Sequence, residues 1–86
     1  MWFDSLEPNM KKRYFFILWT LKEAYGKFTG RGIADMKNVS FSIKNDALIS
    51  DKPHLDFFVY ELDGYILSVC LEKGESPDCD FGSRIY

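Results

Sequence analysis

The sequence predicts an α+β fold, in which an N-terminal amphipathic helix packs on one face of an antiparallel β-meander of 3–5 strands. Three observations support this fold class. Apolar side chains recur at helical spacing near the N-terminus, apolar and polar residues alternate in the middle of the chain, and an Asp-Gly pair joins two apolar runs further on. The length of 86 residues suits one domain, so we interpret residues 1–86 as a single unit.

The predicted helix covers about residues 5–25. Asp4 or Ser5 can cap it, Pro8 suits a first turn that needs no amide donor, and Gly26 is placed to end it. A helical period places six residues on one stripe, which we expect to face the core: Leu6, Met10, Tyr14, Ile17, Leu21 and Ala24.

Three aromatic residues, Phe15, Phe16 and Trp19, point away from that stripe. A helix that covers a single sheet is expected to be polar on its outer side. Two interpretations stay open: the terminal segments of the chain cover these rings, or the rings contact another molecule.

A glycine-rich loop is predicted over residues 26–35. Lys27 and Arg31 in it suggest anion binding, but the loop lacks the Gly-Lys-Ser/Thr ending of a P-loop and the dinucleotide fingerprint. A plain connection from the helix to the first strand is therefore the favoured interpretation.

Strands are predicted over about residues 37–44, 47–50, 55–62 and 65–72, with a fifth, short strand over 81–85. The Asp63-Gly64 turn between the two longest strands predicts a hairpin with Leu62 opposite Tyr65. The face of this hairpin that carries Phe58 is almost wholly apolar, so we expect it to meet the helix.

Charge is divided unevenly along the chain. Residues 1–44 hold 8 Lys/Arg and 4 Asp/Glu, whereas residues 45–86 hold 3 Lys/Arg and 9 Asp/Glu, and the whole chain has a net charge of −2. An acidic total argues against a general nucleic-acid binder. An acidic C-terminal half suits a basic partner, whose approach it would steer, although it also suits plain solubility.

The sequence contains no recognised catalytic, metal or nucleotide motif. His54 is the only histidine, and the spacing of Cys70 and Cys79 matches no zinc site. We therefore expect no enzyme activity, no catalytic residues, no cofactor and no metal. The apolar run from Tyr14 to Leu21 is too short for a signal peptide or a membrane span, which predicts a cytoplasmic protein.

These observations predict a non-catalytic protein-binding module, such as an inhibitor or a toxin-neutralising immunity protein of a toxin–antitoxin type. The partner would be a protein, either a basic toxin or enzyme or a second copy of the chain, with no nucleic acid and no membrane involved. The predicted partner-binding residues are Phe15, Phe16, Trp19, Asp56, Glu61, Asp63, Glu72, Glu75, Asp78 and Asp80. Two alternatives are a small nucleic-acid-binding regulator that uses the basic, aromatic N-terminal half, and a homodimeric structural subunit.

Overall fold

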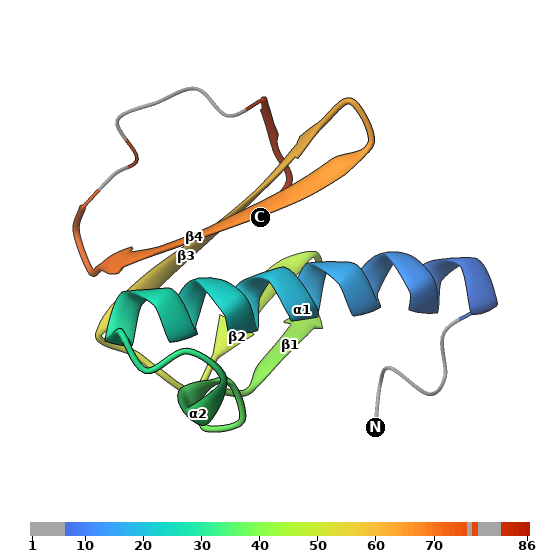
Figure 1. Cartoon of the computed structure of the whole chain (residues 1–86). Coiled ribbons are helices and arrows are strands. Elements are labelled where there is room, and N and C mark those ends of the chain that lie inside the picture. The colour runs from blue at the N-terminus through green and yellow to red at the C-terminus, as the bar shows by residue number, and fades with distance from the viewer. Residues whose placement is uncertain (1–6, 76, 78–81) are drawn as a thin grey trace.

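The computed structural model describes residues 7–75, 77 and 82–86 (Figure 1). Its elements are, in chain order, α1 (Pro8–Thr29), α2 (Ile33–Met36), β1 (Phe41–Lys44), β2 (Ala47–Ser50), β3 (Leu55–Leu62), β4 (Tyr65–Glu72) and β5 (Ser83–Arg84). Strands β1 and β2 form a two-stranded sheet, and a second sheet has the order β4-β3-β5, with every pair antiparallel. The predicted α+β fold class, with an N-terminal helix followed by antiparallel strands, is confirmed.

Helix α1 is longer at its C-terminal end than predicted. It passes through Gly26 and ends at Gly30, which has the left-handed conformation (φ 78°) of a C-cap glycine. Gly26 is instead needed for close packing, because a Cβ atom there would lie 2.7 Å from the backbone oxygen of Gly32. Part of the loop predicted over 26–35 is therefore helical, in the last turn of α1 and in α2.

Both hairpins turn through two residues with positive φ. Asn45 and Asp46 join β1 to β2, with φ of 53° and 61°, and Asp63 and Gly64 join β3 to β4, with φ of 51° and 82°. Positive φ at both central residues is the conformation that matches the twist of the paired strands. The predicted pairing of Leu62 with Tyr65 is confirmed, and so is the register along the rest of the β3–β4 hairpin.

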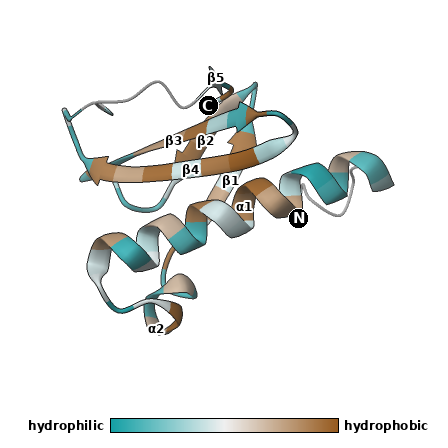
Figure 2. Ribbon diagram, turned by 45° about the horizontal axis from the view of Figure 1, so that its top comes forward, coloured by the Kyte–Doolittle hydropathy of each residue, from teal (hydrophilic) through white to brown (hydrophobic). Residues whose placement is uncertain are grey.

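The prediction of which hairpin face meets α1 is wrong. The mixed face packs on α1, since Val59 joins Ile17 and Leu21 in the buried core, with Phe57 and Ile66 packed against it. The polar residues of this face can lie against α1 because they pair with its polar side chains, Ser68 with Thr20 and Glu61 with Arg13. Figure 2 shows β3 and β4 as mainly hydrophobic strands beside the central part of α1.

The apolar face of the hairpin is directed away from α1. There the guanidinium carbon of Arg84 lies 4.6 Å from the centre of the Phe58 ring, while Leu62, Tyr65 and Leu67 stay exposed. The small sheet closes the other side of the core, where the Phe41 and Phe57 rings meet edge to face at 4.8 Å.

The Thr20 and Ser68 hydroxyl groups join α1 to β4, with their oxygens 2.7 Å apart. Thr20→Val keeps the shape of the side chain but leaves the Ser68 hydroxyl without this partner. We expect the free energy of unfolding to fall by about 1 kcal/mol. Urea unfolding measures this, and a Thr20→Val/Ser68→Ala double variant should recover part of the loss; an equal or larger loss in the double variant would contradict the assigned pair.

Cys70 is buried on β4, and burial raises the pKa of its thiol to about 11. The thiol therefore stays protonated and unreactive near neutral pH. Cys79 lies outside the described residues, so the test uses a Cys79→Ser variant, in which iodoacetamide should label Cys70 only as fast as the protein opens. Rapid labelling of the native variant would contradict this burial.

The same shift has a consequence for stability at high pH. The unfolded chain loses the thiol proton near its ordinary pKa of about 8.5, whereas the folded chain keeps it until about pH 11. The contribution of Cys70 to the free energy of unfolding is therefore fully present below about pH 8.5, and it decreases as the pH rises from about 8.5 to about 11.

Candidate functional site

One face of α1 carries a continuous row of polar side chains. At roughly 100° per residue, Asn9, Phe16, Thr20, Glu23 and Lys27 fall within about 40° of one line along the helix. The row is polar except for Phe16 and extends from the first turn of α1 to the last. We call these five residues the α1 row.

The α1 row borders a cavity at its N-terminal half. The cavity has a volume of about 520 Å³ and lies between α1 and the tip of the β3–β4 hairpin. Its lining residues are Asn9, Lys12, Arg13, Phe16, Thr20, Glu61, Gly64, Tyr65 and Ile66. Arg13 and Glu61 connect its two sides through an ion pair of 2.7 Å between Nη1 and Oε2.

Glu23 and Lys27 form the C-terminal half of the α1 row. They are four residues apart with the acid first, which is the favourable order for a charged pair on a helix. Glu23 is the only acidic residue of α1, which carries five Lys or Arg side chains. Among the described residues, the half-buried Glu23 carboxylate makes no side-chain hydrogen bond or ion pair, which leaves its oxygens available.

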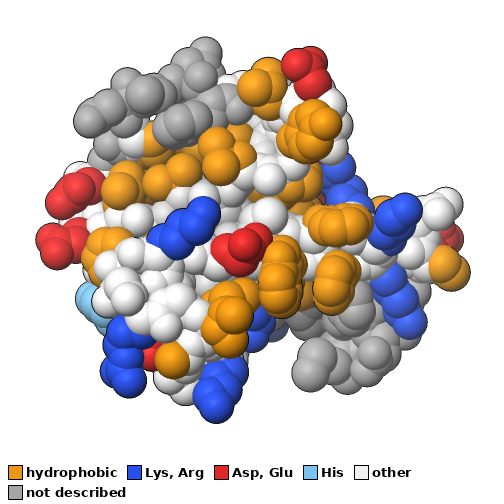
Figure 3. All heavy atoms as spheres, in the orientation of Figure 1, with side chains coloured by type: hydrophobic (Ala, Val, Ile, Leu, Met, Phe, Trp, Pro, Cys, Tyr) orange, Lys and Arg blue, Asp and Glu red, His pale blue; other side chains and the backbone are white. Residues whose placement is uncertain are grey.

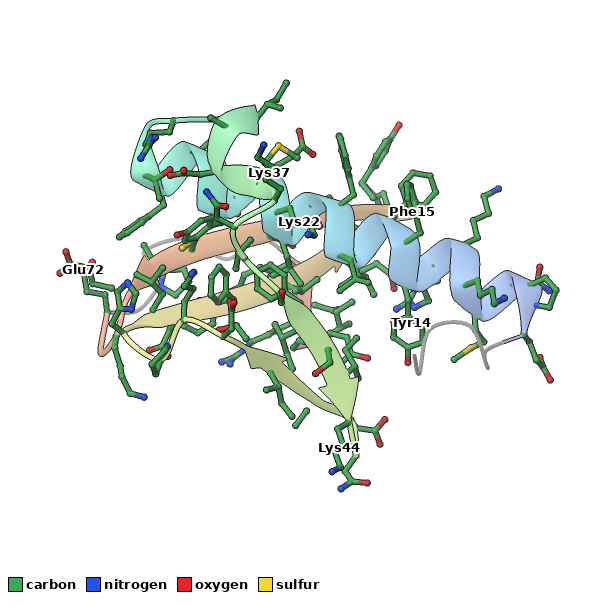
Figure 4. The ribbon with its side chains drawn as sticks, turned by 90° about the horizontal axis from the view of Figure 1, so that it is seen from below. Tyr14, Phe15, Lys22, Lys37, Lys44 and Glu72 are labelled. Carbon is green, nitrogen blue, oxygen red and sulfur yellow. The ribbon has the colours of Figure 1, made fainter. Side chains whose placement is uncertain are left out.

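Lys22 fixes the segment that follows α2. Its Nζ donates to the backbone oxygens of Val39, at 3.1 Å, and Met36, at 3.4 Å. These carbonyl groups orient the ammonium group but do not neutralise its charge. Lys22 therefore adds a positive charge beside Glu23 on a side chain held in place (Figure 4).

The three predicted aromatic anchors lie on the surface. Phe15 is 53% exposed, Phe16 47% and Trp19 47%, and the first two rings meet edge to face at 5.7 Å. Figure 4 shows Phe15 and the half-buried Tyr14 on opposite sides of α1, and Figure 3 shows exposed hydrophobic groups over this helix beside Lys and Arg side chains. Their predicted role in binding a partner stays a prediction.

The predicted acidic residues that the structure describes do not gather on one surface. Glu61 is paired with Arg13, and Oδ2 of Asp56 accepts a hydrogen bond from the backbone N–H of Gly74. Asp63 lies at one end of the eight-residue strands of the hairpin and Glu72 at the other, which places them roughly 25 Å apart along the sheet. Glu75 is exposed beyond β4, and Asp78 and Asp80 lie outside the described residues.

Two features are absent from the described part of the chain. No group of three His, Cys, Asp or Glu side chains is close enough to hold a metal ion. No helix there combines the length and the apolar character needed to cross a membrane.

Comparison with protein families gave one match. The family model described as ACPS, the 4'-phosphopantetheinyl transferase superfamily, matches residues 1–70. This range includes the whole of α1, both hairpin turns and most of β4. Searches of curated proteins and of solved structures returned no match.

This match contradicts the functional predictions made from the sequence. A transferase family conflicts with a non-catalytic inhibitor, immunity or toxin–antitoxin protein, and with the prediction that the chain is no enzyme. Those predictions relied on the absence of nucleophile, metal and P-loop motifs. Transfer of a phosphoryl-linked group relies mainly on positioning and positive charge, so the absence of these particular motifs does not exclude it.

The sequence analysis assigned no role to Glu23. It considered Lys27 for anion binding in a loop but favoured a plain connection, because the helix was expected to end at Gly26. One signal was available in the sequence, since Glu23 is a single acid between two lysines on an otherwise basic helix.

Proposed function

Because this chain belongs to the 4'-phosphopantetheinyl transferase superfamily, we propose that it takes part in the transfer of a 4'-phosphopantetheinyl group. We further propose that Glu23 and Lys27 of the α1 row are its contribution to the reacting site. The family match over residues 1–70 is the observation that carries this proposal, and the unpaired carboxylate of Glu23 supports the placement.

The chemistry of this transfer defines what the site must supply. Coenzyme A carries the 4'-phosphopantetheinyl group on a pyrophosphate, and an acceptor hydroxyl is the simplest group to receive it. The hydroxyl oxygen forms a bond to phosphorus, the bond from that phosphorus to the pyrophosphate bridging oxygen breaks, and the nucleotide phosphate leaves with the electron pair. The hydroxyl proton must be removed, and the negative charge of the phosphates must be stabilised.

The charged groups of α1 meet these two needs. Lys27, in the last turn, offers an ammonium group to a phosphate oxygen, and Lys22, the residue before Glu23, adds a second positive charge to the helix. Glu23 supplies a carboxylate that can accept the hydroxyl proton.

The same carboxylate suits a magnesium ion. Mg²⁺ is commonly held by one or two carboxylates together with substrate phosphates, so Glu23 and the phosphate oxygens are an acceptable set of ligands. When bound, the ion would neutralise charge on the phosphates. Among the described residues, Glu23 belongs to no group of three His, Cys, Asp or Glu side chains that could hold a metal ion.

The exposed aromatic side chains favour a protein as the acceptor. Phe15 and Trp19 lie on α1 beside the α1 row, and large exposed rings commonly contribute to protein interfaces. Because the surrounding charges of α1 are positive, we propose that such an acceptor protein presents an acidic surface.

Coenzyme A binding tests the proposed site. We expect isothermal titration with coenzyme A and Mg²⁺ to give a saturable heat, and Lys27→Met to weaken binding about tenfold through the loss of one charged contact. Lys44→Met is the matched control, since it removes one lysine charge at the tip of the β1–β2 hairpin (Figure 4).

Two results would contradict the placement. One is the absence of saturable heat at about 1 mM coenzyme A, since a dissociation constant above this concentration means weak binding even for a small ligand. The other is an equal loss of affinity in Lys27→Met and Lys44→Met, which would show only the effect of total charge.

A further inference from the structure

The cavity between α1 and the tip of the β3–β4 hairpin is not used by the proposed transfer. Its volume of about 520 Å³ falls in the range of small-molecule sites, which is roughly 300–1,000 Å³. The Arg13–Glu61 ion pair and the Thr20–Ser68 hydroxyl pair both join α1 to the hairpin beside this cavity.

An aromatic residue lines this cavity on each side. Phe16 comes from α1 and is 47% exposed, and Tyr65 comes from the hairpin and is 76% exposed. The Phe16 ring is held by its edge-to-face contact with Phe15. The exposed Phe16 ring favours a flat, apolar occupant that stacks or packs edge to face.

The charged side chains that line the cavity have a net charge of +1. Glu61 neutralises Arg13 across the cavity at 2.7 Å, and Lys12 makes no ion pair to any residue that the structure describes. A ligand with a single negative charge would balance Lys12. A ligand with several charges would find too few cations here.

The polar groups at the base of the cavity restrict the ligand further. Thr20 Oγ1 donates to the backbone oxygen of Ile17 at 2.9 Å, so the proton shared with Ser68 comes from the Ser68 hydroxyl. Thr20 therefore has no proton to offer a ligand. The donors left for an anion are Lys12, the amide of Asn9 and the guanidinium N–H groups of Arg13 that do not bind Glu61.

We propose that this cavity is a binding site for a small aromatic monoanion, a flat ring system that bears one carboxylate or similar group. The ring would pack on Phe16 beside the hairpin tip, and the anionic group would face Lys12. The site does not depend on the proposed transfer, because none of its lining residues is Glu23, Lys22 or Lys27.

Titration of the protein with 2-naphthoate tests this proposal by ¹H–¹⁵N NMR. We expect saturable shifts at the amides of Gly64 and Ile66, at the hairpin end of the cavity. Lys12→Met should weaken binding about three- to fivefold, the effect of one exposed ion pair, and Phe16→Ala should weaken it by a similar factor. 2-Naphthylmethanol, which has the ring without the charge, should bind correspondingly more weakly.

Matched controls separate this site from general attraction to charge or to exposed rings. Lys11→Met removes a neighbouring positive charge outside the cavity lining, and Phe28→Ala removes an exposed ring at the other end of α1. Both should leave the affinity within twofold. The proposal is overturned if the cavity amides show no saturable shift, if Lys11→Met weakens binding as much as Lys12→Met, or if the uncharged alcohol binds as tightly.

Discussion

Replacing Glu23 by Gln should lower the rate of 4'-phosphopantetheinyl transfer by at least about 100-fold, the usual contribution of a single acid–base or electrostatic group. The amide has nearly the same size as the carboxylate but can neither accept the proton nor carry the charge that attracts a divalent cation. A transfer assay with labelled coenzyme A measures this change.

Two comparisons make the result specific to the reaction. Glu23→Asp keeps the charge on a shorter side chain, so it should retain more activity than Glu23→Gln. Glu75→Gln removes an exposed carboxylate beyond β4 and should leave the rate within twofold. The melting temperature of Glu23→Gln should stay close to that of the unchanged protein, because no described side-chain contact depends on the carboxylate. Near-normal activity in this variant would remove Glu23 from the reacting site.

Gly26→Ala should reduce the free energy of unfolding by about 2 kcal/mol. The new Cβ would lie 2.7 Å from the backbone oxygen of Gly32 and 3.1 Å from its Cα, and backbone atoms cannot rotate away as a side chain does. The Gly26 carbonyl also accepts hydrogen bonds from the N–H groups of Gly30 and Gly32, at 3.1 and 3.0 Å, so movement there would weaken the end of α1. The higher helix propensity of Ala offsets only about 1 kcal/mol.

Gly30→Ala is the matched comparison for this effect. Gly30 has φ of 78°, but an added Cβ would meet no atom within 4 Å, so only backbone strain of about 1 kcal/mol is expected. In thermal unfolding, the melting temperature of Gly26→Ala should therefore be several degrees lower than that of Gly30→Ala. The reverse order would show that the two segments do not approach each other closely at Gly26.

The parts of the fold that depend on local geometry were predictable from the sequence. The Asp63-Gly64 turn has two residues, so it fixed the register of β3 and β4 through local backbone conformation alone. The spacing of Ile17 and Leu21 likewise predicted their burial correctly. In both cases the determining interaction lies within a few residues.

The parts that depend on contacts between distant segments were not predictable. Gly26 is required inside α1 because the backbone of Gly32 packs closely against it, and a local sequence pattern does not reveal this contact. The choice of hairpin face depends on pairs such as Thr20 with Ser68 and Arg13 with Glu61, which make a mixed face compatible with α1. Comparing only how apolar the two faces of the hairpin are cannot reveal such side-chain pairs with α1.

The candidate site was missed for a related reason. Phosphoryl-group transfer uses isolated charges placed by the fold, and Glu23 and Lys27 have no distinctive spacing beyond one helical turn. The helical period, in contrast, correctly placed Phe15, Phe16 and Trp19 outside the core stripe. It did not decide whether other parts of the chain cover these rings, and it did not predict the chemistry of the neighbouring face.

The most direct test of the proposed function is transfer from a coenzyme A that carries a fluorophore on its thiol. The protein is incubated with this donor, Mg²⁺ and a cell extract as the source of acceptor hydroxyl groups. We predict covalent fluorescent labelling of protein together with release of an equal amount of adenosine 3',5'-bisphosphate, and neither product with Glu23→Gln. Labelling that is absent with the unchanged protein, or equally strong with Glu23→Gln, would contradict the role assigned to this face of α1.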